Sequence, residues 1–148
     1  MDRNFLQDLF APERRRPLHP VHAILLAFTF PMFLATYLND LAYGATYQIQ
    51  WSNFAAWLII GGLVGCGFAL LWTLIDLARD RDARTQRQII YAALLALTFI
   101  IGFINALIHA KDAWAIMPEA TWLSGITTMC ALLASWIGFS GLRSGELS

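Results

Sequence analysis

Apolar residues along this chain gather into four blocks, which short polar segments containing charged residues, glycine or proline separate. Each block has about 20 residues, enough for a helix to cross roughly 30 Å of hydrocarbon. The pattern predicts four membrane-spanning helices, at residues 21–43, 54–77, 88–110 and 121–142. We therefore expect an all-α fold, an integral membrane four-helix bundle over residues 18–142. Residues 1–17 would form an interfacial or flexible tail, and residues 143–148 a second tail.

The composition agrees with a protein that has lipid as its main solvent. Apolar residues make up 58% of the chain and charged residues 14%, far from the balance of a soluble domain. The formal net charge is zero, so the chain lacks the positive field that attracts nucleic acid. Cys66 and Cys130 lie within apolar blocks without CxxC spacing, which favours packing over a disulfide framework or a zinc site. The expected partner is the lipid bilayer, with no nucleic acid.

Basic residues are distributed unequally between the two sides that the four helices define. Only Lys111 falls on one side, and nine arginines fall on the other: Arg3, Arg14, Arg15, Arg16, Arg79, Arg81, Arg84, Arg87 and Arg143. Positive charge is retained in the cytoplasm. This distribution predicts that the N-terminus, the loop of residues 78–87 and the C-terminus are cytoplasmic, while residues 44–52 and 111–120 face outward.

Small residues recur at four-residue spacing on two of the expected helices. Helices in lipid associate through close packing at such positions. The second helix carries Gly61, Gly65 and Ala69, and the third carries Gly102, Ala106 and Ala110. These stripes suit closure of the bundle and formation of a homodimer equally well.

Polar residues at membrane depth are costly and need a partner or a water-lined pocket. Asn105, His109 and Asp112 follow each other at helical spacing near the outer end of the third helix, and Asp40 ends the first helix at the same depth. One interpretation of this group is a hydrogen-bonded staple between helix ends. The other is a site for a quinone head group or a partner protein.

A second polar group is expected at the cytoplasmic end, where His19 and His22 share a helix face and Asp76 ends the second helix. Pairing of Asp76 with an arginine at headgroup level, with the histidines capping or reaching the headgroups, is the structural alternative to a site. Two facing imidazoles can hold haem. His22 and His109 would lie roughly 25 to 30 Å apart, so one haem within one chain cannot bridge them. A haem shared across a dimer or held by one histidine remains open.

Motifs of soluble catalysis are absent from the chain: it has no P-loop, no dinucleotide glycine fingerprint, no HExxH and no Ser-His-Asp set that the topology brings together. The sequence also shows no inverted repeat with broken helices, which disfavours a transporter. The chain is therefore not expected to be an enzyme by itself.

Four stretches of the chain resemble a bacterial family of inner-membrane proteins, domain of unknown function 2231. They are PLHPVHAILLAF from Pro17, DLAYGA from Asp40, IQWSNFAAWLI from Ile49 and INALIHAKDAW from Ile104. The resemblance covers Pro17 to Gly141. It implies a multi-pass protein of the bacterial inner membrane, distantly similar to di-haem b-type cytochrome bundles.

Relatives often accompany periplasmic quinoprotein-type dehydrogenases, so the resemblance implies a non-catalytic membrane subunit that anchors or couples a periplasmic redox partner. Haem b and quinone are the cofactors it suggests, and a haem b electron carrier or a purely structural or assembly factor are the alternatives. Many relatives place a histidine at the inner start of the third helix. Here that turn runs from Arg87 to Tyr91 without one, so a second haem ligand facing His22 is missing.

Overall fold

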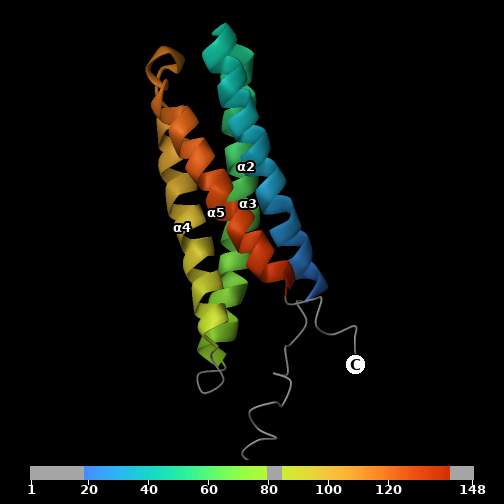
Figure 1. The fold of residues 1–148 in the computed structure, drawn as a ribbon. Coiled ribbons are helices and arrows are strands. Elements are labelled where there is room, and N and C mark those ends of the chain that lie inside the picture. Colours follow the sequence, from blue (N-terminus) through green and yellow to red (C-terminus); the bar gives the residue numbers. More distant parts are fainter. Residues whose placement is uncertain (1–18, 80–84, 141–148) are drawn as a thin grey trace, which may run out of the picture.

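The computed structural model describes residues 19–79 and 85–140 of the chain. Four long helices follow each other, α2 (Pro20–Thr46), α3 (Ile49–Arg79), α4 (Gln86–His109) and α5 (Glu119–Ser140), with a short 3-10 helix η2 (Ala113–Ala115) before α5 (Figure 1). All four long helices are long and apolar enough to cross a membrane. The predicted four-helix membrane bundle is thereby confirmed. Residues 1–17 and the tail from 143 lie outside the described residues.

Local sequence signals explain where the helices begin and end. His19 caps α2 by accepting a hydrogen bond from the Val21 amide, with Pro20 in the first turn. Thr85 and Gln88 form a reciprocal capping box at the start of α4. Tyr47 adopts a left-handed conformation with φ of 53° and ends α2. Because this one residue reverses the chain, α3 begins at Ile49 and the outer loop expected at residues 44–52 shrinks to a tight turn.

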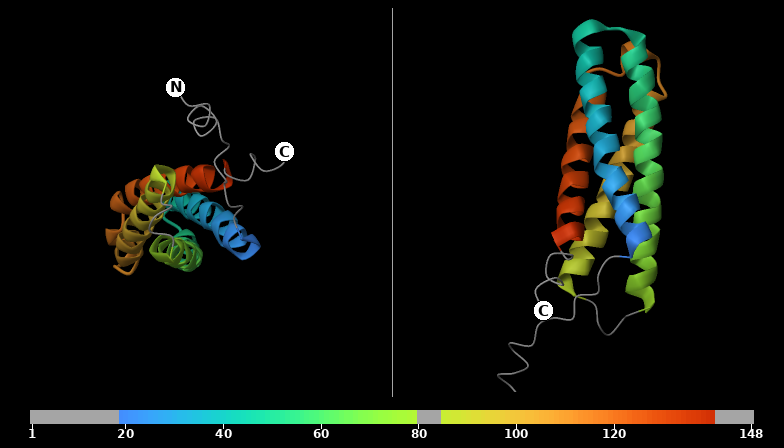
Figure 2. Two further views of the ribbon diagram at one scale, coloured as in Figure 1. Left: turned by 90° about the horizontal axis from the view of Figure 1, so that it is seen from below. Right: turned by 90° about the vertical axis from the view of Figure 1, so that its right-hand side faces the viewer.

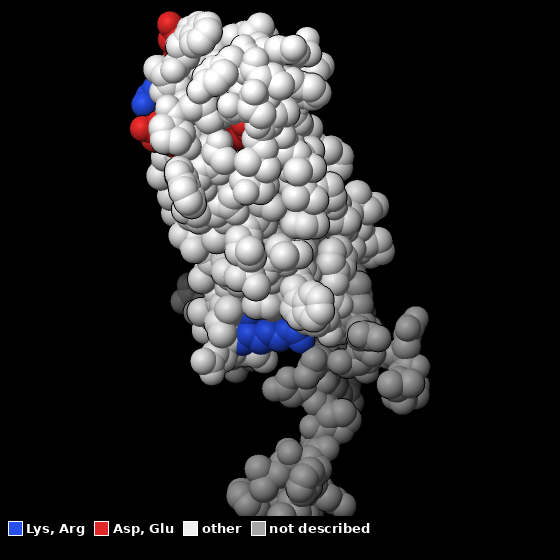
Figure 3. All heavy atoms as spheres, turned by 45° about the horizontal axis from the view of Figure 1, so that its top comes forward, with Lys and Arg blue, Asp and Glu red and all other residues white. Residues whose placement is uncertain are grey.

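The helices form a ring in which each one packs against two neighbours: α2 against α3 and α5, and α4 against α3 and α5. The end-on view in Figure 2 shows this ring, with α2 and α4 on one diagonal. Consecutive helices are antiparallel, so α2 and α4 run in the same direction. We call the end with Tyr47 and η2 the outer end, following the charge distribution, and the opposite end the inner end. On the face that Figure 3 shows, the surface between the two ends carries almost no charge.

The buried faces of α2 and α4 lie opposite each other, and the residues that pair differ by 69 in number, as His22 with Tyr91 and Asp40 with His109 do. On α2 this face comprises His22, Leu26, Thr29, Phe33, Thr36 and Asp40. On α4 the corresponding residues are Tyr91, Leu95, Thr98, Gly102, Asn105 and His109. Ionisable groups thus occupy both ends of each face, and hydroxyl or amide groups alternate with apolar groups between them. Buried threonines on both helices donate to the carbonyl oxygen four residues earlier, which satisfies them locally.

Phe33 fills the centre of the bundle and is 1% exposed. Its ring lies against two glycines: a Cβ atom added at Gly62 would be 2.9 Å from the ring, and one at Gly102 would be 3.1 Å from it. The small residues of α3 and α4 therefore make room for one large side chain of α2. This uses Gly102 in packing, and it adds Gly62, which the spacing of the glycine stripe did not single out.

The predicted stripe on α3 is placed unevenly. Gly65 is buried, and a Cβ atom there would lie 3.3 Å from the Leu25 carbonyl oxygen of α2. Gly61 is only partly buried, and its nearest neighbour is the flexible Met32 side chain at 3.4 Å. Of the two predicted positions, Gly65 therefore lies against the α2 backbone, whereas Gly61 meets only a flexible side chain.

Candidate functional site

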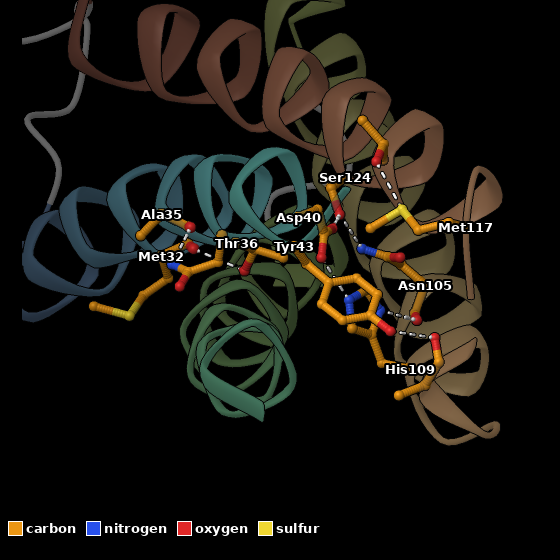
Figure 4. Close-up of polar contacts among 12 residues, drawn as sticks. Met32, Ala35, Thr36, Asp40, Tyr43, Asn105, His109, Met117 and Ser124 are labelled. Atoms are coloured by element: carbon orange, nitrogen blue, oxygen red, sulfur yellow. Dashed lines mark hydrogen bonds and ion pairs between the residues drawn. The ribbon is translucent and has the colours of Figure 1, made fainter. Parts of the chain in front are cut away.

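A polar cluster joins three helices at the outer end of the bundle (Figure 4). Asp40 of α2 is 0% exposed and lies 2.8 Å from His109 Nε2 at the end of α4. Its other carboxylate oxygen accepts a hydrogen bond from the Ser124 hydroxyl of α5. Asn105 Nδ2 of α4 donates to Ser124 Oγ at 2.8 Å. We call these four residues, Asp40, Asn105, His109 and Ser124, the outer cluster.

The helices orient the outer cluster by their own geometry. His109 is four residues after Asn105 on α4, and its Nδ1 lies 3.0 Å from the Asn105 carbonyl oxygen, which fixes the plane of the imidazole ring. The His109 side chain is 1% exposed. Interhelical hydrogen bonds of this kind contribute roughly 0.6 to 2 kcal/mol each in membrane bundles. The cluster therefore ties α2, α4 and α5 together through side chains that are buried inside the bundle.

Asp112 does not join the outer cluster, although the sequence grouped it there. Helix α4 ends at His109, so the helical spacing that would align Asp112 with Asn105 stops before it. Asp112 is exposed and its side chain caps nothing at η2. The loop is instead held by Tyr43 of α2, which is 1% exposed and donates to the Ala113 carbonyl oxygen at 3.0 Å.

At the inner end, His22 of α2 contacts Tyr91 of α4, the helix diagonally opposite. His22 Nε2 lies 2.8 Å from the Tyr91 hydroxyl of α4, and His22 is 2% exposed. The Trp72 ring of α3 packs near both histidines, with ring centroids 4.9 Å from His19 and 6.0 Å from His22. His19 and Asp76 are exposed, so the structure brings His22 into the bundle and leaves the other two residues on its surface.

Three of the four ring nitrogens of His22 and His109 already contact the protein, and the fourth, His22 Nδ1, is buried without a hydrogen-bond partner. His22 Nε2 faces Tyr91, and both ring nitrogens of His109 face oxygen atoms of the protein. Phe33 fills the space between the two ends. Two grooves on the surface of the described residues, one between α2 and α5 and one between α3 and α4, contain no histidine in their lining. Among the residues that the structure describes, no three His, Cys, Asp or Glu side chains gather where they could share a metal ion.

Sequence reasoning had not identified two partners in these contacts. Ser124 was not singled out in the sequence, and Tyr91 was noted only as the end of the turn that lacks a histidine. The signal that links Tyr91 to His22 is the shared spacing of polar residues on two helices, His22 to Asp40 on α2 and Tyr91 to His109 on α4. Eighteen residues make five turns of an α-helix, so each pair of residues lies on one face. This spacing does not point to Ser124, which lies on α5.

Comparison with known proteins agrees with this architecture. A family model described as a predicted membrane protein (DUF2231) matches residues 18–145. The chain belongs to this family. No curated protein and no solved structure matches it. Membership supports a multi-pass membrane protein in a lipid bilayer, and the matched residues include both His22 and the whole outer cluster.

Proposed function

We propose that this protein is a non-catalytic membrane subunit that anchors a periplasmic redox partner through its outer end. The proposal rests on an exposed aromatic pair, Tyr47 and Trp114, whose backbone is held in place by buried residues of the bundle. Tyr47 and Trp114 stack with ring centroids 6.0 Å apart and an interplanar angle of 13°. Trp114 is 74% exposed. Large aromatic side chains presented this way are typical anchors of protein interfaces.

Two features hold the Tyr47–Trp114 pair in place: the Tyr43 hydrogen bond to Ala113 and the outer cluster. Tyr47 ends α2 directly beyond the buried Tyr43, and the Tyr43 hydroxyl binds the backbone of Ala113, next to Trp114. The outer cluster fixes the helix ends below. An interface that is ordered before binding loses less conformational entropy when a partner docks. The redox character of the partner rests on the family resemblance, and the inner membrane of a bacterium is the location we propose with it.

Two equally exposed tryptophans offer a matched test. Trp114 and Trp136 are each 74% exposed, and Trp136 lies near the inner end of α5. We expect Trp114→Ala to reduce recovery of a periplasmic oxidoreductase with the tagged protein from native membranes at least tenfold, and Trp136→Ala to leave recovery unchanged. Equal recovery with both variants, at equal amounts of folded protein, would remove the aromatic pair as the docking surface.

A quinone link is supported by a groove on the outside of the bundle. Between α2 and α5 lies a groove of about 580 Å³ whose lining is mostly apolar, within the usual size of a small-molecule site. Two of its lining residues, Tyr37 and Thr121, carry hydroxyl groups, and that of Thr121 donates to Met117 Sδ. We propose this groove for a quinone, with the chain in the apolar part and the head group at the hydroxyls. Gly125→Phe should block the groove, and a loss of bound quinone in that variant, measured by extraction from the purified protein, tests the assignment.

A further inference from the structure

Donor and acceptor can be assigned for each contact of the outer cluster, in which Asn105 Oδ1 is the one buried side-chain oxygen without a partner. A backbone carbonyl oxygen only accepts, so the contact of His109 Nδ1 with the Asn105 carbonyl requires a proton on Nδ1. The Asn105 amide nitrogen only donates, so the Ser124 oxygen accepts from it and directs its own proton to Asp40. One contact is left, between His109 Nε2 and Asp40 Oδ1 at 2.8 Å.

That remaining contact needs one further proton. Without it, a lone pair on His109 Nε2 would face a carboxylate oxygen at hydrogen-bond distance, which is repulsive. With it, the pair is either an imidazolium with a carboxylate or an imidazole with a carboxylic acid. Both forms carry no net charge, which is the form that a buried membrane site accommodates at least cost.

No neighbouring group can replace this proton. On α3 the first charged residue is Asp76, at the inner end. On α2 the other titratable groups near the outer end are Tyr37, which lines the groove against α5, and Tyr43, whose hydroxyl already binds Ala113. From α5 the cluster receives Ser124, which is not titratable in water. The charged residues beyond α4, namely Lys111, Asp112 and Glu119, are exposed.

We propose that Asp40 and His109 form a binding site for a single exchangeable proton, and that this proton holds α2 and α4 together at the outer end. The site exchanges its proton with the outer side of the membrane. His109 is the last residue of α4, and the exposed loop residues Lys111 and Asp112 follow it almost directly. Loss of the proton leaves one uncompensated negative charge, so the diagonal contact opens when the site is empty. This inference is independent of the proposed partner.

The test compares proton uptake by the purified protein in lipid nanodiscs. Asp40→Asn keeps the size of the side chain and lets an amide donate to His109 Nε2, so the pair no longer needs the additional proton. Between alkaline and neutral pH, we expect the parent protein to bind one proton more per chain than Asp40→Asn. Asp112→Asn, the same change at an exposed position of the same end, should match the parent protein. Equal uptake by the parent protein and Asp40→Asn would overturn the proposal.

A second measurement does not depend on the folding of any variant. Nitrogen NMR of labelled histidine in the parent protein reports the protons on both ring nitrogens of His109, and the infrared band of a protonated carboxyl reports Asp40. At neutral pH we expect either two N–H signals from His109 or a carboxylic acid band. A neutral imidazole together with an ionised carboxylate would show that the site holds no additional proton and would refute it.

Discussion

Gly62→Ala should destabilise the bundle by about 2 to 3 kcal/mol, although alanine is the better helix former. The added methyl carbon would lie 2.9 to 3.1 Å from three atoms of the Phe33 ring. The ring has little room to shift, because its Cζ and Cε1 atoms also lie against Gly102. Overpacking a filled core costs about 1 to 3 kcal/mol, and we expect the upper part of that range because the ring lies against both glycines.

Gly61→Ala is the matched control. It introduces the same residue one position away on α3, where the nearest atom is the flexible Met32 sulfur at 3.4 Å. Any gain in helix propensity is common to both variants, so the difference in their stability isolates the contact with Phe33. We expect Gly61→Ala to remain within about 0.5 kcal/mol of the parent protein.

Phe33→Leu should partly rescue Gly62→Ala, since the shorter side chain removes the contact. The double-mutant cycle is expected to give a coupling of about 1 to 2 kcal/mol. Reversible unfolding in mixed micelles, followed by circular dichroism, provides the free energies. Equal stability of Gly62→Ala and Gly61→Ala, or a coupling near zero, would mean that the Phe33 ring does not fill the space between α3 and α4.

Other parts of the bundle give three further predictions. Gly65→Leu should strongly lower thermal stability in detergent, because the leucine side chain would push against the α2 backbone. Stability equal to that of the parent protein would contradict this contact. Arg87→Gln should cost about 1 to 2 kcal/mol in micelle unfolding, because Arg87 donates to the last turn of α5; Arg79→Gln is its control. A cysteine at Gly44 should react with an impermeant reagent from outside and one at Gly145 should not, and the reverse result would invert the orientation.

The sequence predicts the architecture well because membrane insertion depends on the length and polarity of segments. Four apolar blocks suffice to predict four helices. The outer turn was predicted too long because its length depends on one residue, Tyr47, in a left-handed conformation that hydropathy does not report. Asp112 was placed with Asn105 and His109 by helical spacing, which fails once α4 ends at His109.

Contacts within the bundle were harder to predict, since they depend on which helices are diagonal. The spacing of small residues points to Gly61 and Gly65 equally, and only the position of Phe33 on α2 shows why Gly62 is the tighter site. The pairing of Asp40 with His109 follows from the register of two helices that are not neighbours in sequence. The predicted depth of Asp40 and His109 in the membrane puts both at the same level. Depth alone does not identify Ser124 of α5 as the residue that binds Asp40 and Asn105.

Because α2 and α4 belong to one chain, residues that differ by 69 in number meet on the bundle axis, and the two residues of a pair can differ in chemistry. Two identical hairpins meeting on a two-fold axis would place each axial residue opposite its own copy, so an aspartate would meet an aspartate and a histidine would meet a histidine. Joining both hairpins in one chain removes that constraint. Each axial position can then hold an unlike pair, as Asp40 with His109 and His22 with Tyr91 do, and acid can face base inside a nearly symmetric scaffold.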